Sequence, residues 1–222
     1  MNGWTVESCD LTETRLYIKV VSPLTREVSV GDPVQAGFVI SNSEVGLGAV
    51  SVQPLVYRLS CKNGAIVQDY GVTKKHVGRN YITGDDGAYE LFSDETRRLS
   101  DRALIAQIGD VVKTSVNEAK FALVVDRFAE TLKRPIEGDP VKATEILAKQ
   151  VSLNEMERVS VLQHLISGGT LTQYGLINAV TATAQSNDLS YDRATQLEAI
   201  GGKMIDMPVS DWRSIATAGK AA

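Results

Sequence analysis

The 222-residue chain has few of the residues on which disulfide-rich, metal-binding and acid–base catalytic proteins depend. It contains two cysteines, Cys9 and Cys61, and two histidines, His76 and His164. A disulfide scaffold normally needs more cysteines, so we expect both thiols to be reduced, as they are in the cytoplasm. Histidine is the side chain that ordinarily titrates near neutral pH. Because His164 lies beside apolar positions of a predicted helix, we interpret it as a partly buried structural residue.

The chain also lacks the sequence motifs of the common catalytic and cofactor sites. It has no nucleophile elbow, no phosphate-binding loop and no dinucleotide fingerprint, and no Cys/His cluster has zinc spacing. Gly46 and Gly48 form only a Gly-x-Gly, which favours a turn between strands. We therefore expect a protein that is not an enzyme and needs no cofactor or metal.

A group of acids is the one feature that could support hydrolysis. Carboxylate oxygens can hold a hard cation, but these acids lack the loop spacing of a known cation site. A solvated acidic loop is the simpler interpretation, and a cation-dependent hydrolase is a distant alternative. The acids are Asp85, Asp86, Glu90, Asp94 and Glu95.

Long apolar runs are missing as well. No run approaches the roughly 18 apolar residues of a membrane span, and the first residues lack the basic start and apolar segment of a signal peptide. With 43% hydrophobic and 23% charged residues the composition is typical of a globular protein. A net charge of −4 argues against coating duplex DNA with the whole surface, but it allows a local basic face. We expect a soluble cytoplasmic protein with no membrane partner.

The first third of the chain has the alternation and the β-branched content of strands. Asn63-Gly64 is the strongest short signal for a tight hairpin turn, because both residues tolerate positive φ. Pro54 cannot donate to a β-ladder, so we expect its strand to lie partly at an edge or a bulge. The predicted strands are residues 15–21, 34–41, 49–60 and 65–68, with breaks at Pro23 and at Gly31-Asp32-Pro33. Their order predicts an antiparallel meander.

From Ser93 onward the apolar residues recur at helical spacing. Asp94 and Glu95 suit the positive end of a helix dipole, and Lys133-Arg134-Pro135 supplies bases and a proline at the other end. Gly109 permits a kink between them. These features predict one long helix over about residues 93–134. Its apolar stripe would be Ile105, Ile108, Val112, Val116, Ala119 and Leu123.

Shorter helices are predicted after the linker at residues 136–140. The first helix begins with the capping-box pattern at residues 152–155 and should end at Gly168-Gly169. The second helix begins with a similar pattern at residues 170–173 and runs to about residue 185. The third, near residues 190–200, should stop at Gly201-Gly202, and the tail after Pro208 should be frayed. The second helix contains no Arg or Lys, so the pair of helices around Gly168-Gly169 is interpreted as a packing hairpin and not as a DNA-reading unit.

Together these elements predict an α+β fold. Residues 1–134 would form the β-meander and the long helix, and residues 135–222 a C-terminal helical bundle. We interpret the two regions as one continuous domain.

The strongest functional pattern is a basic segment between residues 58 and 81 that contains a single acid, Asp69. Cations that neutralise phosphates beside aromatics that stack on bases are what single-strand binders need. The alternative is a solvated edge whose lysines discourage strand-to-strand aggregation. The candidate nucleic-acid-binding residues are Arg58, Lys62, Lys74, Lys75, His76 and Arg79, with Tyr70 and Tyr81 as stacking residues.

Four stretches, SNSEVGLGAV, LVYRLSCKNGAI, KKHVGR and YGLINAVTATA, resemble the family called phage/plasmid-like proteins, a domain of unknown function. The resemblance spans about residues 35–185, and family members often have an additional N-terminal segment. The matching residues are Ser41, Asn42, Ser43, Gly46, Gly48, Arg58, Cys61, Asn63, Gly64, His76, Gly78, Arg79, Asn178, Ala179 and Thr181. The resemblance implies a phage or mobile element in a bacterial host, and no settled activity.

Strands followed by a long helix are also similar to the core of Rad52-like single-strand annealing proteins, although fold alone does not fix function. We therefore predict a phage or mobile-element DNA-metabolism protein that binds single-stranded nucleic acid and anneals or recombines strands. The alternative is a non-enzymatic host-takeover or assembly module of a phage that acts through protein contacts. A meander leaves open sheet edges, so we also predict a homo-oligomer.

Overall fold

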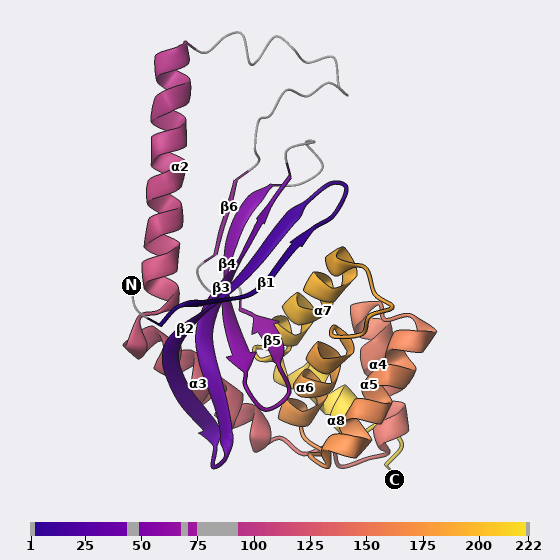
Figure 1. Cartoon of the computed structure of the whole chain (residues 1–222). Helices are drawn as coiled ribbons and strands as arrows, with labels where there is room; N and C mark the ends of the chain where they lie inside the picture. The colour runs from indigo at the N-terminus through magenta and orange to yellow at the C-terminus, as the bar shows by residue number, and fades with distance from the viewer. Residues whose placement is uncertain (1–2, 44–48, 68–70, 75–92, 221–222) are drawn as a thin grey trace.

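The structure is a computed structural model that describes residues 3–43, 49–67, 71–74 and 93–220. An antiparallel sheet occupies the N-terminal part of the chain and helices occupy the rest, as Figure 1 shows. The predicted α+β class, with a meander followed by a long helix and a helical bundle, is confirmed.

The sheet is a meander in which each strand is antiparallel to its neighbour. The strands are β1 (Thr5–Leu11), β2 (Leu16–Ser29), β3 (Asp32–Asn42), β4 (Val50–Arg58), β5 (Asn63–Ile66) and β6 (Val72–Lys74). Strands β1 to β4 follow in sequence order, and the outer side of β4 is shared by β6 along Val50–Val52 and by β5 along Leu55–Arg58. Strands β5 and β6 thus both pair with β4, each toward a different end of it.

Pro23 and Pro54 both lie within strands, although Pro23 was predicted to be a break. Strand β2 continues through Pro23, with an irregularity in its pairing to β3 between Val21 and Thr25. Pro54 lies in β4, opposite Phe38 of β3, so β4 is not an edge strand, but its outer ladder is interrupted at this part of the strand, where an edge or a bulge was predicted. Its missing N–H is tolerated because pairing on the outer side changes there from β6 to β5. Strand β1 was not predicted at all.

The Asn63-Gly64 pair does not form the hairpin turn, so that prediction is wrong. The turn is made by residues 59–62, with Lys62 at φ 53°, and Asn63 pairs with Arg58 as the first residue of β5. Both Asn63 and Gly64 are buried, and a Cβ added to Gly64 would lie 2.6 Å from Leu55 Cδ1. The glycine is therefore needed for close packing against β4 and not for backbone freedom.

The long helical segment is divided into α2 (Asp94–Ser115) and α3 (Glu118–Leu132). The break is at Asn117, whose side chain caps α3 by accepting from the Lys120 amide, and Gly109 lies inside α2. The predicted apolar stripe is also wrong, because none of its six residues is buried. Ile105 is 68% exposed and Leu123 is 66% exposed, and Ala119 is exposed as well. The face of α3 that is buried carries Phe121, Val124, Val125 and Phe128.

Five helices complete the described chain: α4 (Pro140–Val151), α5 (Glu155–Gly168), α6 (Gln173–Thr183), α7 (Tyr191–Met204) and α8 (Val209–Ala216). The capping box that begins α5 is formed by Asn154 and Glu157, because Ser152 ends α4 in the left-handed conformation. Gly169 ends α5 as predicted, at φ 68°. The predicted fraying after Pro208 is wrong for residues 209–216, which form α8 and bury Trp212 and Ile215.

Helix α7 packs closely against β5 and α6, and Gly201-Gly202 lies at both of these contacts. These glycines do not end α7 as predicted. A Cβ on Gly202 would lie 1.9 Å from the Ile66 carbonyl oxygen of β5, and one on Gly201 would lie 2.4 Å from Thr181 Cγ2 of α6. Helix α7 can approach β5 this closely only because Gly202 has no side chain, and Gly201 allows the same close approach to α6.

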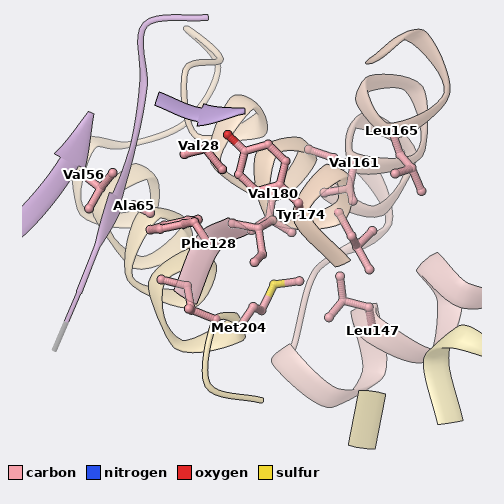
Figure 2. Close-up of a cluster of buried hydrophobic side chains, with 14 of the residues drawn as sticks. Val28, Val56, Ala65, Phe128, Leu147, Val161, Leu165, Tyr174, Val180 and Met204 are labelled. Carbon is pink, nitrogen blue, oxygen red and sulfur yellow. The ribbon is translucent and has the colours of Figure 1, made fainter. Parts of the chain in front are cut away.

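One hydrophobic cluster joins the sheet to the helices. It includes Val28, Val56 and Ala65 from the strands, Phe128 from α3, and residues of every helix from α4 to α8. Figure 2 shows strand residues of this cluster together with Tyr174, Val161, Leu147 and Met204 from the helices. Burial of these apolar side chains is the main force that holds the two layers together.

A buried ion pair also links the two layers. Lys19 Nζ of β2 donates to Glu198 Oε1 of α7 over 2.6 Å, and the two side chains are 11% and 1% exposed. The ammonium lies 5.4 Å from the ring centroid of Tyr191, and burial raises the pKa of Glu198 even though Lys19 and Gln185 oppose that shift. Charges taken out of water in this way are costly unless each keeps its partner.

We predict that Lys19→Ala lowers the free energy of unfolding by about 3–5 kcal/mol, because Glu198 is left buried without its counter-charge. The double variant Lys19→Met/Glu198→Leu should be clearly more stable than Lys19→Ala, since no charge remains buried. Denaturant unfolding measures both. The control is Lys133→Ala, which breaks an exposed pair with Glu130 and should cost less than about 1 kcal/mol. Equal losses for Lys19→Ala and Lys133→Ala would contradict the prediction.

Candidate functional site

A pocket of about 410 Å³ lies between the sheet and the helices. It is lined by the β2–β3 turn, the β4–β5 turn, the C-terminal end of α5 and one side of α6. Leu132, Leu165 and Ala182 give it apolar walls, and Arg58 and Asn63 bring polar groups to it. Apolar walls with a few placed polar groups are typical of small-molecule sites, which have volumes of about 300–1,000 Å³.

Arg58 reaches the pocket from the last position of β4 and is held there by two residues far away in sequence. Its Nε donates to Asp32 Oδ1 over 2.6 Å, and its guanidinium lies 5.7 Å from the ring centroid of Tyr174. The Tyr174 hydroxyl donates to the other Asp32 oxygen over 2.5 Å. One carboxylate therefore fixes both side chains, and its charge compensates that of Arg58.

Burial is the main reason that the pKa of Tyr174 is raised well above its usual range, and the hydrogen bond to Asp32 adds to it. The ionised phenolate would be poorly solvated there and would face the Asp32 carboxylate. At neutral pH the phenol is therefore a protonated donor, and Asp32 is the acceptor.

Asn63 is the most deeply buried polar residue of the pocket, with 1% of its surface exposed. Its Nδ2 donates to Thr181 Oγ1 over 2.6 Å and to the Asn178 carbonyl over 3.3 Å. The Asn178 carbonyl can only accept, so the amide orientation is fixed. Asn63 Oδ1 has no hydrogen-bond partner among the described residues, and Asn63 also lines a smaller cavity of about 10 Å³ beside Arg58 and Tyr174.

The described part of the chain places only some of the predicted nucleic-acid-binding residues. Lys62 is exposed at the tip of the β4–β5 turn, and Arg58 is paired with Asp32. The backbone of Lys74 lies in β6, opposite Val50. Tyr70, Lys75, His76, Arg79 and Tyr81 lie outside the described residues, as do Asp85, Asp86 and Glu90 of the predicted acidic loop.

Within the described part of the basic segment, Arg58 and the backbone of Lys74 lie far apart. Arg58 is the last residue of β4, whereas Lys74 lies in β6 opposite Val50, the first residue of β4. Eight residue steps along a strand correspond to roughly 26 Å. Of the described residues after Arg58, β5 and β6 both pair with the outer side of β4, toward its two ends.

Sequence reasoning misses or misplaces several residues of the pocket. Local patterns indicate Asp32 only as part of a turn and Tyr174 only as part of a packing helix. His164 lines the pocket and is exposed, so the predicted partly buried position is wrong. Five residues of the predicted resemblance line this pocket: Arg58, Cys61, Asn63, Asn178 and Ala179.

Neither a metal-binding cluster nor a membrane-spanning helix occurs in the part of the chain that the structure describes. No group of three or more His, Cys, Asp or Glu among those residues is arranged to hold a metal ion. No described helix has both the length and the apolar content to cross a lipid bilayer. Cys9 and Cys61 are exposed free thiols.

Comparison of the chain with models of known protein families, with curated proteins and with solved structures finds no match. The resemblance to phage/plasmid-like proteins and the similarity to annealing proteins therefore stay predictions. Any function assigned to the chain depends on the geometry of the pocket and on the basic segment beside it.

We predict that the free energy of unfolding falls as the pH rises above about 10, in part because of Tyr174. An unfolded tyrosine loses its proton near pH 10, whereas folded Tyr174 keeps it, so the unfolded state binds fewer protons and gains stability as the pH rises. Tyr174→Phe should make this decline shallower between pH 9 and 11, and should cost about 1.5–3 kcal/mol at pH 7 through the lost hydrogen bond to Asp32. Denaturant unfolding at several pH values measures both effects. Parallel pH profiles for the two proteins would contradict the assignment.

Proposed function

We propose that this protein binds single-stranded nucleic acid through the basic segment of residues 58–81, beginning at the pocket beside the β4–β5 turn. The supporting observation is that the exposed cation Lys62 and the polar pocket lie next to each other, at one end of the basic segment. A cation holds a phosphate without regard to sequence, and a neighbouring polar pocket offers contacts to a base. Tyr70, Lys74, Lys75, His76, Arg79 and Tyr81 remain the predicted contacts farther along the strand.

The arrangement changes the role that we propose for Arg58. Because Asp32 compensates its charge, Arg58 contributes less to phosphate binding than an exposed lysine does. Its guanidinium is instead held rigidly at the pocket wall, where it can donate to a base. Binding of this kind needs no cofactor, and annealing or recombination of strands in a bacterial host would be its use.

Protein interaction is the second candidate function, and helix α2 favours it. Leu99 and Ile105 of α2 are 58% and 68% exposed. Exposed apolar residues on one long helix are suited to binding a partner protein. In this alternative the basic segment only solvates the sheet edge.

The first test is a titration with single-stranded DNA at several salt concentrations. If three to five phosphates are neutralised, log affinity should fall with log salt at a slope of roughly −2 to −3.5. The variant Lys62→Glu/Lys74→Glu/Lys75→Glu should bind more weakly and give a shallower slope, because the counterions that these cations displace are no longer released. Equilibrium fluorescence anisotropy measures both quantities.

The matched control is Lys149→Glu, which reverses an exposed cation on α4, away from β4. It should leave the slope unchanged. Binding that responds to neither salt nor the triple variant would remove the nucleic-acid proposal and leave the interaction module.

Self-association is proposed on the basis of strand β1. In the described part of the sheet, β1 pairs only with β2, whereas β5 is covered by α7. An unpaired edge can pair with a neighbouring copy, and repetition of weak phosphate contacts along one strand increases affinity. Strand β1 is therefore the surface that we assign to assembly.

We predict a mass of several times 24 kDa by multi-angle light scattering of the protein, alone or with single-stranded DNA. Val6→Pro should reduce this mass, because a proline in β1 removes one edge donor and disfavours strand pairing. Val209→Pro, at the exposed first residue of α8, is the control and should leave the mass unchanged. A uniform mass of 24 kDa in both conditions would contradict self-association.

A further inference from the structure

We infer that the pocket beside the β4–β5 turn receives one unstacked base of the bound strand, while the adjoining phosphate stays outside at Lys62. This inference rests on the proposed function and adds the class of group that the pocket binds. It is carried by the charge, the hydrogen-bonding groups and the shape of the pocket.

The charge of the pocket favours a neutral ligand. Arg58 and Asp32 form an ion pair of 2.6 Å with side chains only 24% and 9% exposed, so their charges cancel inside the wall. A phosphate placed there would lie beside the Asp32 carboxylate and would have to give up its own hydration. The exposed ammonium of Lys62 offers the phosphate a better position, one residue away from Cys61 of the pocket wall.

The hydrogen-bonding groups of the pocket suit a base edge. Asn63 Oδ1 is an acceptor with no partner among the described residues, and its orientation is fixed by the bonds of Nδ2 to α6. Arg58 uses Nε and Nη1 for Asp32 and Cys61, and no described residue accepts from Nη2. A base edge carries acceptors, so it can bind Arg58 Nη2 at the pocket wall, while Asn63 Oδ1 is itself buried beside the smaller cavity.

The walls of the pocket supply stacking surface. Leu132, Leu165 and Ala182 are apolar, and the Arg58 guanidinium is held beside the ring of Tyr174. Proteins that bind single strands commonly hold splayed bases against such apolar and guanidinium surfaces. A volume of about 410 Å³ is within the range of small-molecule sites, so it leaves room for a base.

The pocket is also formed in advance by rigid elements. Asp32, Arg58 and Asn63 lie at strand ends, and Tyr174 and Asn178 lie on α6. The hydrogen bonds from Asn63 and Tyr174 tie these strand ends to the helix. A preformed pocket does not have to be ordered when the base enters, which lowers the cost of binding.

The test uses a short single-stranded oligonucleotide that carries one 2-aminopurine and a terminal dye. Stacking quenches 2-aminopurine, so entry of the base into the pocket should raise its fluorescence by roughly twofold or more at saturation. Dye anisotropy reports binding separately. The pocket-filling variant is Ala182→Leu/Ser167→Leu, since both residues line the pocket and neither side chain contacts Asp32, Arg58 or Asn63.

The filled variant should still bind the oligonucleotide with an unchanged salt slope, but less than half of the fluorescence rise should remain. Ser167→Leu alone, at an exposed position of α5, is the milder variant if the double substitution impairs folding, and it should lower the rise in part. Ala103→Leu, at an exposed position of α2, is the matched control and should leave the rise unchanged.

The two proposals fail in different ways. Binding by anisotropy with no fluorescence rise, or with an equal rise in the filled variant, overturns base insertion and leaves single-strand binding standing. An absence of any anisotropy change with the unmodified protein removes single-strand binding and, with it, base insertion.

Discussion

Strand β5 is the place where the sheet and the helical layer come into contact most closely, and the rest of the structure depends on that contact. Helix α7 crosses it at Gly202, where the Ile66 carbonyl leaves no room for a Cβ. Helix α6 is fixed to it by the hydrogen bond from Asn63 to Thr181. Close packing of this kind admits little variation in side-chain volume. The pocket exists because α6 and the β4–β5 turn are held together along this strand.

Charged residues that are buried or half-buried form ion pairs between different elements of the fold. Asp32 compensates Arg58, and Lys19 compensates Glu198 across the interface between β2 and α7. Arg193 of α7 lowers the pKa of Glu157 through a hydrogen bond, in the capping box that begins α5. Each pair joins segments that are far apart in sequence. Such pairs specify which surfaces meet, because a wrong pairing would leave a buried charge without its partner.

The sequence predicted the elements better than their contacts. The antiparallel order and the Gly169 helix end follow from local patterns, and both are observed. The errors at Asn63-Gly64 and Gly201-Gly202 have a common cause, because glycine serves both for positive φ and for close approach. Local sequence does not distinguish these two uses. At both positions the partner, Leu55 or Ile66, belongs to another element.

For the candidate site, too, the sequence predicted local properties and the tertiary structure decided the contacts. The sequence by itself determined the class of the fold, the start of α2, the end of α3 and the start of α6 near their observed positions, and the basic character of residues 58–81. Only the tertiary structure decided that Arg58 is paired with Asp32, that Tyr174 completes this network, and that Lys62 and Lys74 lie toward opposite ends of β4. The physical reason is that charge and periodicity are properties of neighbouring residues, whereas pairing and burial depend on residues far apart in the chain, such as Tyr174 and Asp32, separated by 142 positions.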